Sequence, residues 1–257
     1  MKKLINRIKS LVIWVSIALL IIVWLPVMAL VRLLDRDEAR YYTGRCFRVL
    51  GKAISRINPR WRISYSVPPD LNDRTPYVII SNHLSNADIP LISNIPWEMK
   101  WTAKRELFKV PFIGWMMRMA GDISVDRKAA SRRASTLSQA EYYLKRKCSV
   151  IFFPEGTRSR NGKLGKFTSG AFELAVASGA AIVPIVVDGT QDALPRTSWV
   201  FSKDSDIRLK VLPPIPTNDM GKEQVPQLIE EVRSRILNQL AEWRNNQKYE
   251  NDQMYPK

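Results

Sequence analysis

From residue 59 onward, short apolar runs alternate with longer segments of helical periodicity. Asn58-Pro59 ends the helical pattern before them, because the residue preceding a proline disfavours helical conformation. The predicted strands are Trp61–Val67, Tyr77–Ser81, Met99–Ala103, Ile123–Asp126, Ser149–Phe153, Ala181–Val187 and Ile207–Leu212. The predicted helices are Ile89–Ser93, Phe112–Ala120, Ala129–Lys147, Ser169–Ser178 and Gln224–Asn245. This alternation predicts an α/β domain over residues 59–245, followed by a polar, frayed tail at 246–257.

Residues 1–58 follow a different pattern, which predicts a membrane attachment. Met1–Ser10 carries four basic residues, and Leu11–Val31 then contains no charge. An apolar run of about 20 residues is just long enough to cross a bilayer as a helix. Pro26 is expected to divide this run, and the part before it would reach only about 22 Å against roughly 30 Å of hydrocarbon. A cleaved secretory signal is disfavoured, because the run ends without a small-x-small site.

Residues 41–57 have an amphipathic pattern with helical spacing. The apolar face carries Cys46, Phe47, Leu50, Ala53, Ile54 and Ile57, and the cationic face carries Arg45, Arg48, Lys52 and Arg56. Such a pattern is typical of a helix lying in the plane of the lipid headgroups. Because both flanks of the apolar run are basic, we expect a membrane-associated helical hairpin that dips into one leaflet and leaves the domain on the cytoplasmic face. Two alternatives stay open, a single membrane span and an ordinary helix packed on the core.

Composition narrows the classes of function. A chain of 257 residues with 46% hydrophobic content suits one sizeable domain plus an attachment. The formal net charge of +16 indicates an anionic partner, such as anionic membrane lipids or a phosphorylated substrate. No nucleic-acid partner is expected, because the basic clusters lack interleaved aromatic residues and any recognised binding motif. One histidine and two distant cysteines give no metal-ligand set, and the sequence has no glycine-rich phosphate loop.

The first candidate for chemistry is the stretch from Ser81 to Asp88, which follows a predicted buried strand. It contains His83, the sole histidine of the chain. Imidazole is the side chain suited to proton transfer near neutral pH. Asp88 lies five residues later, where a strand-to-helix turn can bring its carboxylate to the ring and fix the tautomer.

A second candidate stretch, Phe153-Pro154-Glu155-Gly156-Thr157-Arg158-Ser159, also follows an apolar strand. Pro154 stops the strand, and Gly156 permits backbone conformations that other residues resist. Polar side chains from Glu155 to Ser159 are therefore expected to project from a loop at that strand end.

Together these stretches resemble the motifs of the PlsC-like glycerolipid acyltransferases. The carrying pattern is Asn82-His83, four residues, then Asp88, followed downstream by Phe153–Arg158. Weaker blocks at Ala103–Gly114, Gly121–Arg127 and Ile182–Val186 are also similar, so the resemblance covers roughly Ile63 to Ile215. It implies a single mixed-sheet α/β domain with flanking helices, of the glycerol-3-phosphate acyltransferase-like type.

The resemblance implies transfer of an acyl group from a thioester, acyl carrier protein or coenzyme A, to the sn-2 hydroxyl of lysophosphatidic acid. The product would be phosphatidic acid. His83 would be the general base, oriented by Asp88, and the hydroxyl would attack directly without an acyl-enzyme. No cofactor is expected beyond the thioester co-substrate. The implied location is the cytoplasmic face of the inner membrane.

The resemblance also supplies candidate substrate-binding residues. Arg158 is the first candidate for the acceptor phosphate, since a guanidinium binds phosphate bidentately, and Lys104 and Arg127 follow. Glu155 is expected to hold Arg158 or a glycerol hydroxyl rather than to move protons. The last candidates are Gly156 and Thr157, whose backbone N–H groups could donate to the phosphate or to a developing oxyanion.

Several alternatives stay open. The acceptor could be another lysophospholipid or an aminolipid. A catalytically silent lipid-binding membrane protein on the same fold is the competing class. The donor, acyl length and oligomeric state do not follow from the sequence.

Overall fold

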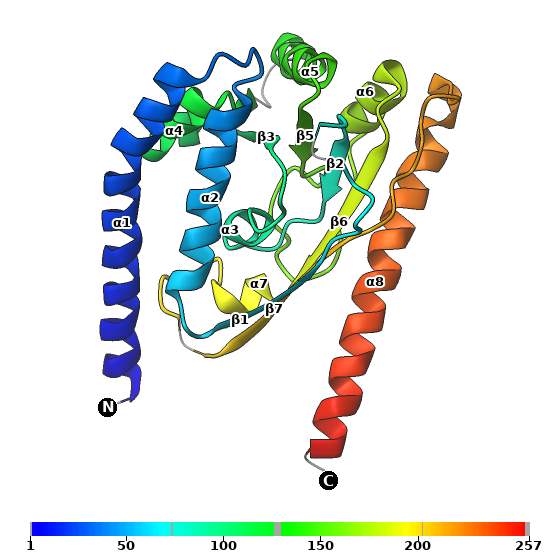
Figure 1. Ribbon diagram of the computed structural model, residues 1–257. Coiled ribbons are helices and arrows are strands. Elements are labelled where there is room, and N and C mark those ends of the chain that lie inside the picture. Colours follow the sequence, from blue (N-terminus) through cyan, green and yellow to red (C-terminus); the bar gives the residue numbers. More distant parts are fainter. Residues whose placement is uncertain (1, 73, 126–129, 202, 255–257) are drawn as a thin grey trace.

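A computed structural model describes residues 2–72, 74–125, 130–201 and 203–254, and shows a mixed sheet flanked by helices (Figure 1). In this part of the chain the sheet has seven strands in the order β1-β7-β6-β2-β5-β3-β4. Only the β6–β7 pair is antiparallel among the described pairs. The strands are β1 Trp61–Ser66, β2 Val78–Ser81, β3 Met99–Lys104, β4 Ile123–Val125, β5 Ser149–Phe152, β6 Ile182–Asp188 and β7 Ser205–Val211. The mixed-sheet prediction is confirmed, and the predicted strand ends are correct to within two residues, apart from Asp126, which lies outside the described residues.

The helices of the domain agree less closely with the pattern. They are α3 Asp88–Ile92, η1 Arg105–Lys109, α4 Ile113–Ala120, α5 Ala130–Lys145, α6 Gly170–Ser178, α7 Thr190–Ala193, η2 Lys222–Gln224 and α8 Val225–Met254. The sequence did not predict the short helices η1, α7 and η2. The predicted end of the last helix at Asn245 is wrong, because α8 continues to Met254. No glycine or proline interrupts the sequence between those residues, so nothing breaks the helix there.

Two hydrophobic layers cover the sheet. Alternate residues of β2 point to opposite faces: Val78 and Ile80 pack with α5, α6 and α8, whereas Ile79 packs with α3 and β7. All four residues of β2 are buried, which explains why its sequence is a continuous apolar run rather than an alternating one. The polar loops after β2 and β5 therefore begin at buried, rigid strands.

The N-terminal segment forms a helical hairpin of α1 Lys2–Leu34 and α2 Tyr41–Ile57, which lie side by side and run in opposite directions (Figure 1). The expected division at Pro26 is wrong, since α1 continues through it as one helix of 33 residues. At 1.5 Å per residue it is about 50 Å long, so length no longer argues against a complete crossing. It is long and apolar enough to span a membrane, and large apolar side chains along it, such as Leu11, Leu19 and Val23, are exposed.

Helix α2 lies between α1 and the domain. Leu50 packs with Met28 of α1 and Met116 of α4, while the opposite face of α2 meets β3 and α3. The expectation that the cationic face of α2 lies among lipid headgroups is wrong for Arg48, which is only 5% exposed. At Arg48 the helix packs on the core instead, because this side chain finds a buried carboxylate in the domain, whereas Arg56 of the same face is exposed. The position of the hairpin relative to a membrane stays a prediction.

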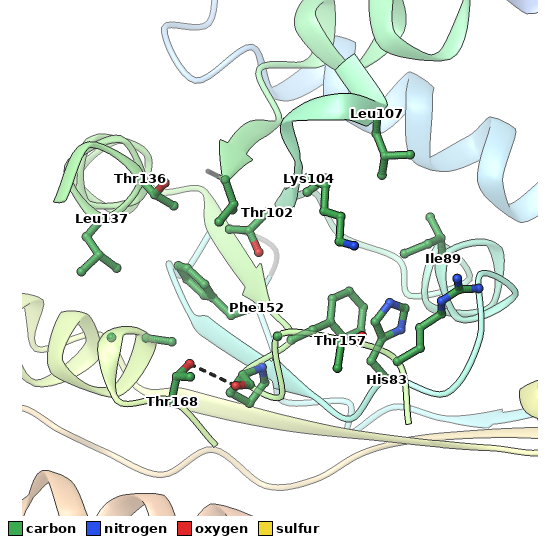
Figure 2. Close-up of a pocket in the computed structure, with 18 of the residues that line it drawn as sticks. His83, Ile89, Thr102, Lys104, Leu107, Thr136, Leu137, Phe152, Thr157 and Thr168 are labelled. Carbon is green, nitrogen blue, oxygen red and sulfur yellow. Dashed lines mark hydrogen bonds between the residues drawn. The ribbon is translucent and has the colours of Figure 1, made fainter. Parts of the chain in front are cut away.

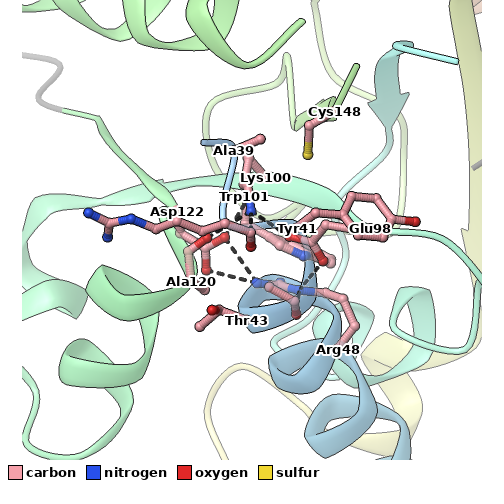
Figure 3. Close-up of polar contacts among 12 residues, drawn as sticks. Ala39, Tyr41, Thr43, Arg48, Glu98, Lys100, Trp101, Ala120, Asp122 and Cys148 are labelled. Carbon is pink, nitrogen blue, oxygen red and sulfur yellow. Dashed lines mark hydrogen bonds and ion pairs between the residues drawn. The ribbon is translucent and has the colours of Figure 1, made fainter. Parts of the chain in front are cut away.

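A buried ionic cluster joins α2 to β3 (Figure 3). Nη2 of Arg48 donates to both oxygens of Asp122 at 3.0 Å, and Nζ of Lys100 donates to Oε1 of Glu98 at 3.0 Å. A Cβ on Gly44 would lie 1.8 Å from that same glutamate oxygen, so only glycine lets α2 approach this closely. Burial raises the pKa of Glu98, while Lys100 and Arg48 oppose the rise. The cluster fixes the hairpin against the strand that leads to Lys104.

Candidate active site

The loop after β2 brings His83 and Asp88 together. The strand ends at Ser81, and Asp88 opens α3, so the chain turns between them. Nδ1 of His83 lies 2.7 Å from Oδ2 of Asp88. The imidazole stacks on Phe153 from the other strand end, with ring centroids 4.2 Å apart. The predicted contact of the two side chains is therefore present.

The carboxylate of Asp88 is held from four directions. Its Oδ2 also accepts the backbone N–H groups of Leu84 and Ser85, and its Oδ1 accepts the hydroxyl of Thr190. A carboxylate can only accept in such a site, so the hydrogen on the ring is assigned to Nδ1 of His83. Nε2 of His83, which has no partner among the described residues, is then left with a free lone pair.

Glu155 links the two motif loops rather than binding Arg158. Its Oε1 accepts the backbone N–H of His83 and its Oε2 accepts that of Gly165, both at 2.8 Å. Burial raises the pKa of Glu155, and these two N–H groups oppose the rise. Among the described residues it forms no ion pair with Arg158, so this part of the expectation is wrong, while contact with a glycerol hydroxyl stays a prediction. Both carboxylate oxygens are occupied by backbone donors, which gives Glu155 a role in positioning His83.

The second loop makes a tight turn after Phe153. Gly156 has a φ of 69°, and its N–H donates to the carbonyl of Phe153. That amide is used within the turn, so the expectation that it assists a phosphate or oxyanion is not met. Thr157 lines the cleft, and its N–H has no acceptor among the described residues. The N–H of Ser159 donates to the carbonyl of His83 at 2.8 Å, which locks the two loops together.

A cleft of about 740 Å³ opens beside His83 and is cationic at one side (Figure 2). Lys104 from the end of β3, Arg158 and Arg196 line it, and within the described chain none of the three forms an ion pair. Figure 2 shows the Lys104 side chain extending into the space above His83. Arg127, the remaining predicted cation, lies outside the described residues. The unpaired cations make this end of the cleft suited to an anionic group.

The far end of the cleft is apolar. Figure 2 shows Leu137 and Phe152 there, away from His83, with Thr136 beside Leu137, and Val125 and Ala171 also line the cleft. An apolar slot that continues from a cationic pocket matches a molecule with a charged head and a hydrocarbon chain.

Sequence reasoning missed two supporting residues, Thr190 and Arg196, and assigned no role to a third, Asn82. Thr190 and Arg196 come from the segment after β6, more than a hundred residues beyond His83. Asn82 exchanges two hydrogen bonds with the backbone of Val187, which ties the histidine loop to β6. The run Asp188-Gly189-Thr190 after an apolar strand was an available signal of a third functional loop.

Together these features equip the site for proton transfer. The described residues contain no group of three or more side chains able to hold a metal ion. A hydroxyl placed at Nε2 of His83 would give up its proton to an imidazole held by Asp88. The cations nearby would hold the anionic part of the same molecule.

Comparisons with known proteins place these features in a family. The family model described as "Acyltransferase" matches residues 62–188. The 1-acyl-sn-glycerol-3-phosphate acyltransferase of Saccharomyces cerevisiae is 33% identical over 208 residues, which cover 79% of this chain and 67% of that protein. The human alpha enzyme of the same name is 37% identical over 72% of this chain and 65% of its own.

Other relatives differ in length or are known as structures. The chloroplastic enzyme of Arabidopsis thaliana is 37% identical over 63% of this chain, but the match covers only 44% of its own length. The crystal structure of the 1-acyl-sn-glycerophosphate acyltransferase PlsC from Thermotoga maritima superimposes with a TM-score of 0.80 and 25% identity, over 95% of this chain and 98% of that one. The chain therefore belongs to the acyltransferase family that includes these 1-acyl-sn-glycerol-3-phosphate acyltransferases.

Proposed function

We propose that this protein transfers a fatty acyl group from an acyl thioester to the sn-2 hydroxyl of lysophosphatidic acid and so makes phosphatidic acid. The observation that carries the proposal is the free Nε2 of His83, in a cleft with cations at one end and an apolar slot at the other. The names of the relatives support the choice of acceptor.

The chemistry needs one base and no covalent intermediate. Nε2 of His83 takes the hydroxyl proton as the new C–O bond forms, and the C–S bond breaks to release the carrier thiolate. The imidazolium then gives that proton up, directly or through solvent, to the thiolate, which leaves as the thiol and restores the neutral base. Asp88 keeps the ring oriented and balances the charge of the imidazolium. General-base assistance of this kind is worth roughly 10²–10⁴-fold in rate.

The acceptor's phosphate lies, in this proposal, against Lys104, Arg158 and Arg196. A phosphate monoester carries up to two negative charges, which three cations can balance. The reacting hydroxyl then points toward His83, and an acyl chain follows the apolar slot near Phe152. The apolar helix α1, which is long and apolar enough to span a membrane, supports membrane attachment, and we assign the cleft to the cytoplasmic face of the inner membrane.

The experiment is a product assay over a panel of lysolipid acceptors with both acyl carrier protein and coenzyme A thioesters. Full-length protein should release thiol only when lysophosphatidic acid is present, and should make phosphatidic acid. Thiol release with another lysolipid alone would move the assignment to that acceptor. No release with any pair would leave a lipid-binding protein and reject the enzyme.

Arg158→Ala tests which substrate the cationic end binds. Hydrogen bonds to charged groups contribute about 1.5–3 kcal/mol, so kcat/KM for lysophosphatidic acid should fall roughly ten- to a hundredfold. Arg158→Lys should recover only part of the loss, because it keeps the charge and loses the planar fork. A rise in the KM of the thioester alone would instead assign Arg158 to the donor.

A further inference from the structure

A second cavity, of about 480 Å³, lies beside the edge strand β4. Among the described residues, its lining shares no member with that of the catalytic cleft. Four segments contribute to it: the α1–α2 connection, η1 with α4, the turn into β4 with Ser124, and α5. Its four cationic side chains are Arg40, Arg105, Lys109 and Arg118.

Three of the four cations of this cavity have no ion-pair partner within the described chain. Asp122 is the one carboxylate in the described lining, and it is committed to the buried side, where Arg48 donates to both of its oxygens (Figure 3). Within the described chain, Arg40, Lys109 and Arg118 form no ion pair. A cavity with several cations and, among its described lining residues, no available carboxylate attracts an anion.

A hydroxyl without a partner adds a directional donor. Tyr143 is half-buried in the lining, and its hydroxyl has no hydrogen-bond partner among the described residues. Gly121, with a φ of 77°, keeps the space beside it open, since a Cβ there would lie 2.5 Å from that hydroxyl oxygen and 3.5 Å from Cδ of Arg40. Burial raises the pKa of Tyr143, so the hydroxyl keeps its proton at neutral pH. The hydroxyl and the Arg40 side chain thus meet at one place.

The same segments expose large apolar side chains. Leu107, Val110 and Trp115 are 46%, 44% and 48% exposed, and they alternate with the cations of η1 and α4. Helix α4 also packs on α1, the candidate membrane helix. Cations interleaved with exposed aliphatic and aromatic residues are typical of a protein surface that lies in the lipid interface.

We propose that this cavity binds the headgroup of an anionic membrane lipid, outside the catalytic cleft, with preference for a phosphate monoester. A monoester presents up to two charges and three acceptor oxygens to the cations and the tyrosine hydroxyl. The bound headgroup would fix the β4 edge of the sheet on anionic membranes. The inference rests on membrane attachment through α1 and does not depend on the acyl-transfer assignment.

The test counts lipids bound to the full chain by native mass spectrometry, from neutral detergent micelles doped with phosphatidic acid, phosphatidylglycerol or phosphatidylcholine. All measurements use the Arg158→Gln background, which removes a cation of the catalytic cleft. Adding Lys109→Gln with Arg118→Gln should weaken phosphatidic acid binding at least about tenfold, because two charged donors are lost. Both side chains are exposed, so folding should persist; Arg40 is left intact because its Nη1 donates to the carbonyl of Arg118.

Two further variants separate the cavity from general charge. Lys203, Lys222 and Arg235 belong to none of the segments that line the cavity, and changing them together to Gln removes more charge than the pair but should leave binding within about twofold. Tyr143→Phe alters no charge and should still weaken phosphatidic acid binding severalfold, and phosphatidylglycerol binding less.

Several outcomes would overturn the proposal. Equal weakening in the distant triple variant would show nonspecific attraction, and unchanged binding in the Lys109/Arg118 pair would exclude this cavity. Displacement of the lipid by equimolar inorganic phosphate would assign the cavity to a soluble phosphate. If the Lys109→Gln/Arg118→Gln variant lost binding of acyl carrier protein and kept lipid binding, the cavity would be assigned to the carrier protein.

Discussion

The His83–Asp88 pair and the Arg48–Asp122 pair each join a basic side chain to a buried aspartate. They differ in whether the basic side chain keeps a nitrogen atom that has no hydrogen-bond partner and is open to the cleft. In each pair the aspartate accepts a hydrogen bond from its basic partner and also backbone N–H groups, two for Asp88 and one for Asp122. The histidine side chain is 17% exposed at the cleft, and its Nε2 has no partner. The arginine side chain is 6% exposed and donates its hydrogen bonds to buried groups of the protein. The first pair can act on a substrate, and the second can only hold the hairpin to the sheet.

The comparison shows that a buried aspartate can serve chemistry only when its basic partner keeps a nitrogen atom unbonded and open to the cleft, as His83 does with Nε2. Removing the partner should therefore have opposite consequences in the two places. At the cleft it should remove activity and spare the fold, and in the buried cluster it should cost stability and spare chemistry per folded molecule.

His83→Ala should produce the largest effect. We expect kcat to fall by roughly 10²–10⁴-fold, because the sole base is lost, while the thermal midpoint stays close to that of the wild type. Initial rates of thiol release and a thermal unfolding curve provide both measurements. Turnover near the wild-type rate would end the general-base assignment.

Arg48→Met should lower stability and leave activity nearly unchanged, the reverse of His83→Ala. Asp122 would be left buried without its cation, which typically costs about 3–5 kcal/mol in the free energy of unfolding. Denaturant unfolding in detergent measures this loss, and the rate per folded molecule should be little changed. Arg48→Met with Asp122→Asn should lose less than the single variant, since the neutral amide oxygen still accepts the N–H of Trp101. A double variant less stable than the single one would contradict the charge argument.

Asp88→Asn should have an intermediate effect, at least about tenfold in kcat with little change in KM. An amide must turn its NH₂ toward one of the donors that the carboxylate accepts, so the imidazole loses its fixed tautomer. Thr190→Val is the milder companion, because it removes only the donor at Oδ1 and should cost a few-fold. Equal and near-normal rates in both variants would show that His83 needs no orienting partner.

The smallest effect is expected from Cys148, and it concerns how thiol labelling and stability depend on pH. Burial raises the pKa of its thiol to about 12, from an ordinary 9.0, so at pH 8 it is a neutral thiol that thiol reagents label slowly. The native state then holds this proton more tightly than the unfolded chain, so stability should decline as the pH rises from about 9 toward 12. Labelling and unfolding of Cys46→Ser, compared with Cys46→Ser/Cys148→Ala, isolates the effect. Rapid labelling at pH 8 in the folded protein would refute it.

The sequence by itself determined the strands, the domain class and the first half of the site. Apolar β-branched runs such as Val78–Ser81 must be buried, and a motif that follows such a run must lie at the sheet edge. A lone histidine with an aspartate five residues away is a local feature, so its geometry is set within one turn. The local pattern also identified α2 as amphipathic.

Only the tertiary structure decided which polar groups meet across the chain. Thr190 reaches Asp88 over 102 residues, Glu155 reaches the backbone of His83 over 72, and Arg48 reaches Asp122 over 74. Sequence periodicity shows which residues of a helix or strand lie on its apolar face and which on its polar face. It does not show whether a cation on the polar face is buried or exposed to solvent. The partner that makes burial favourable lies on another strand, and strand order is set by packing of the whole sheet.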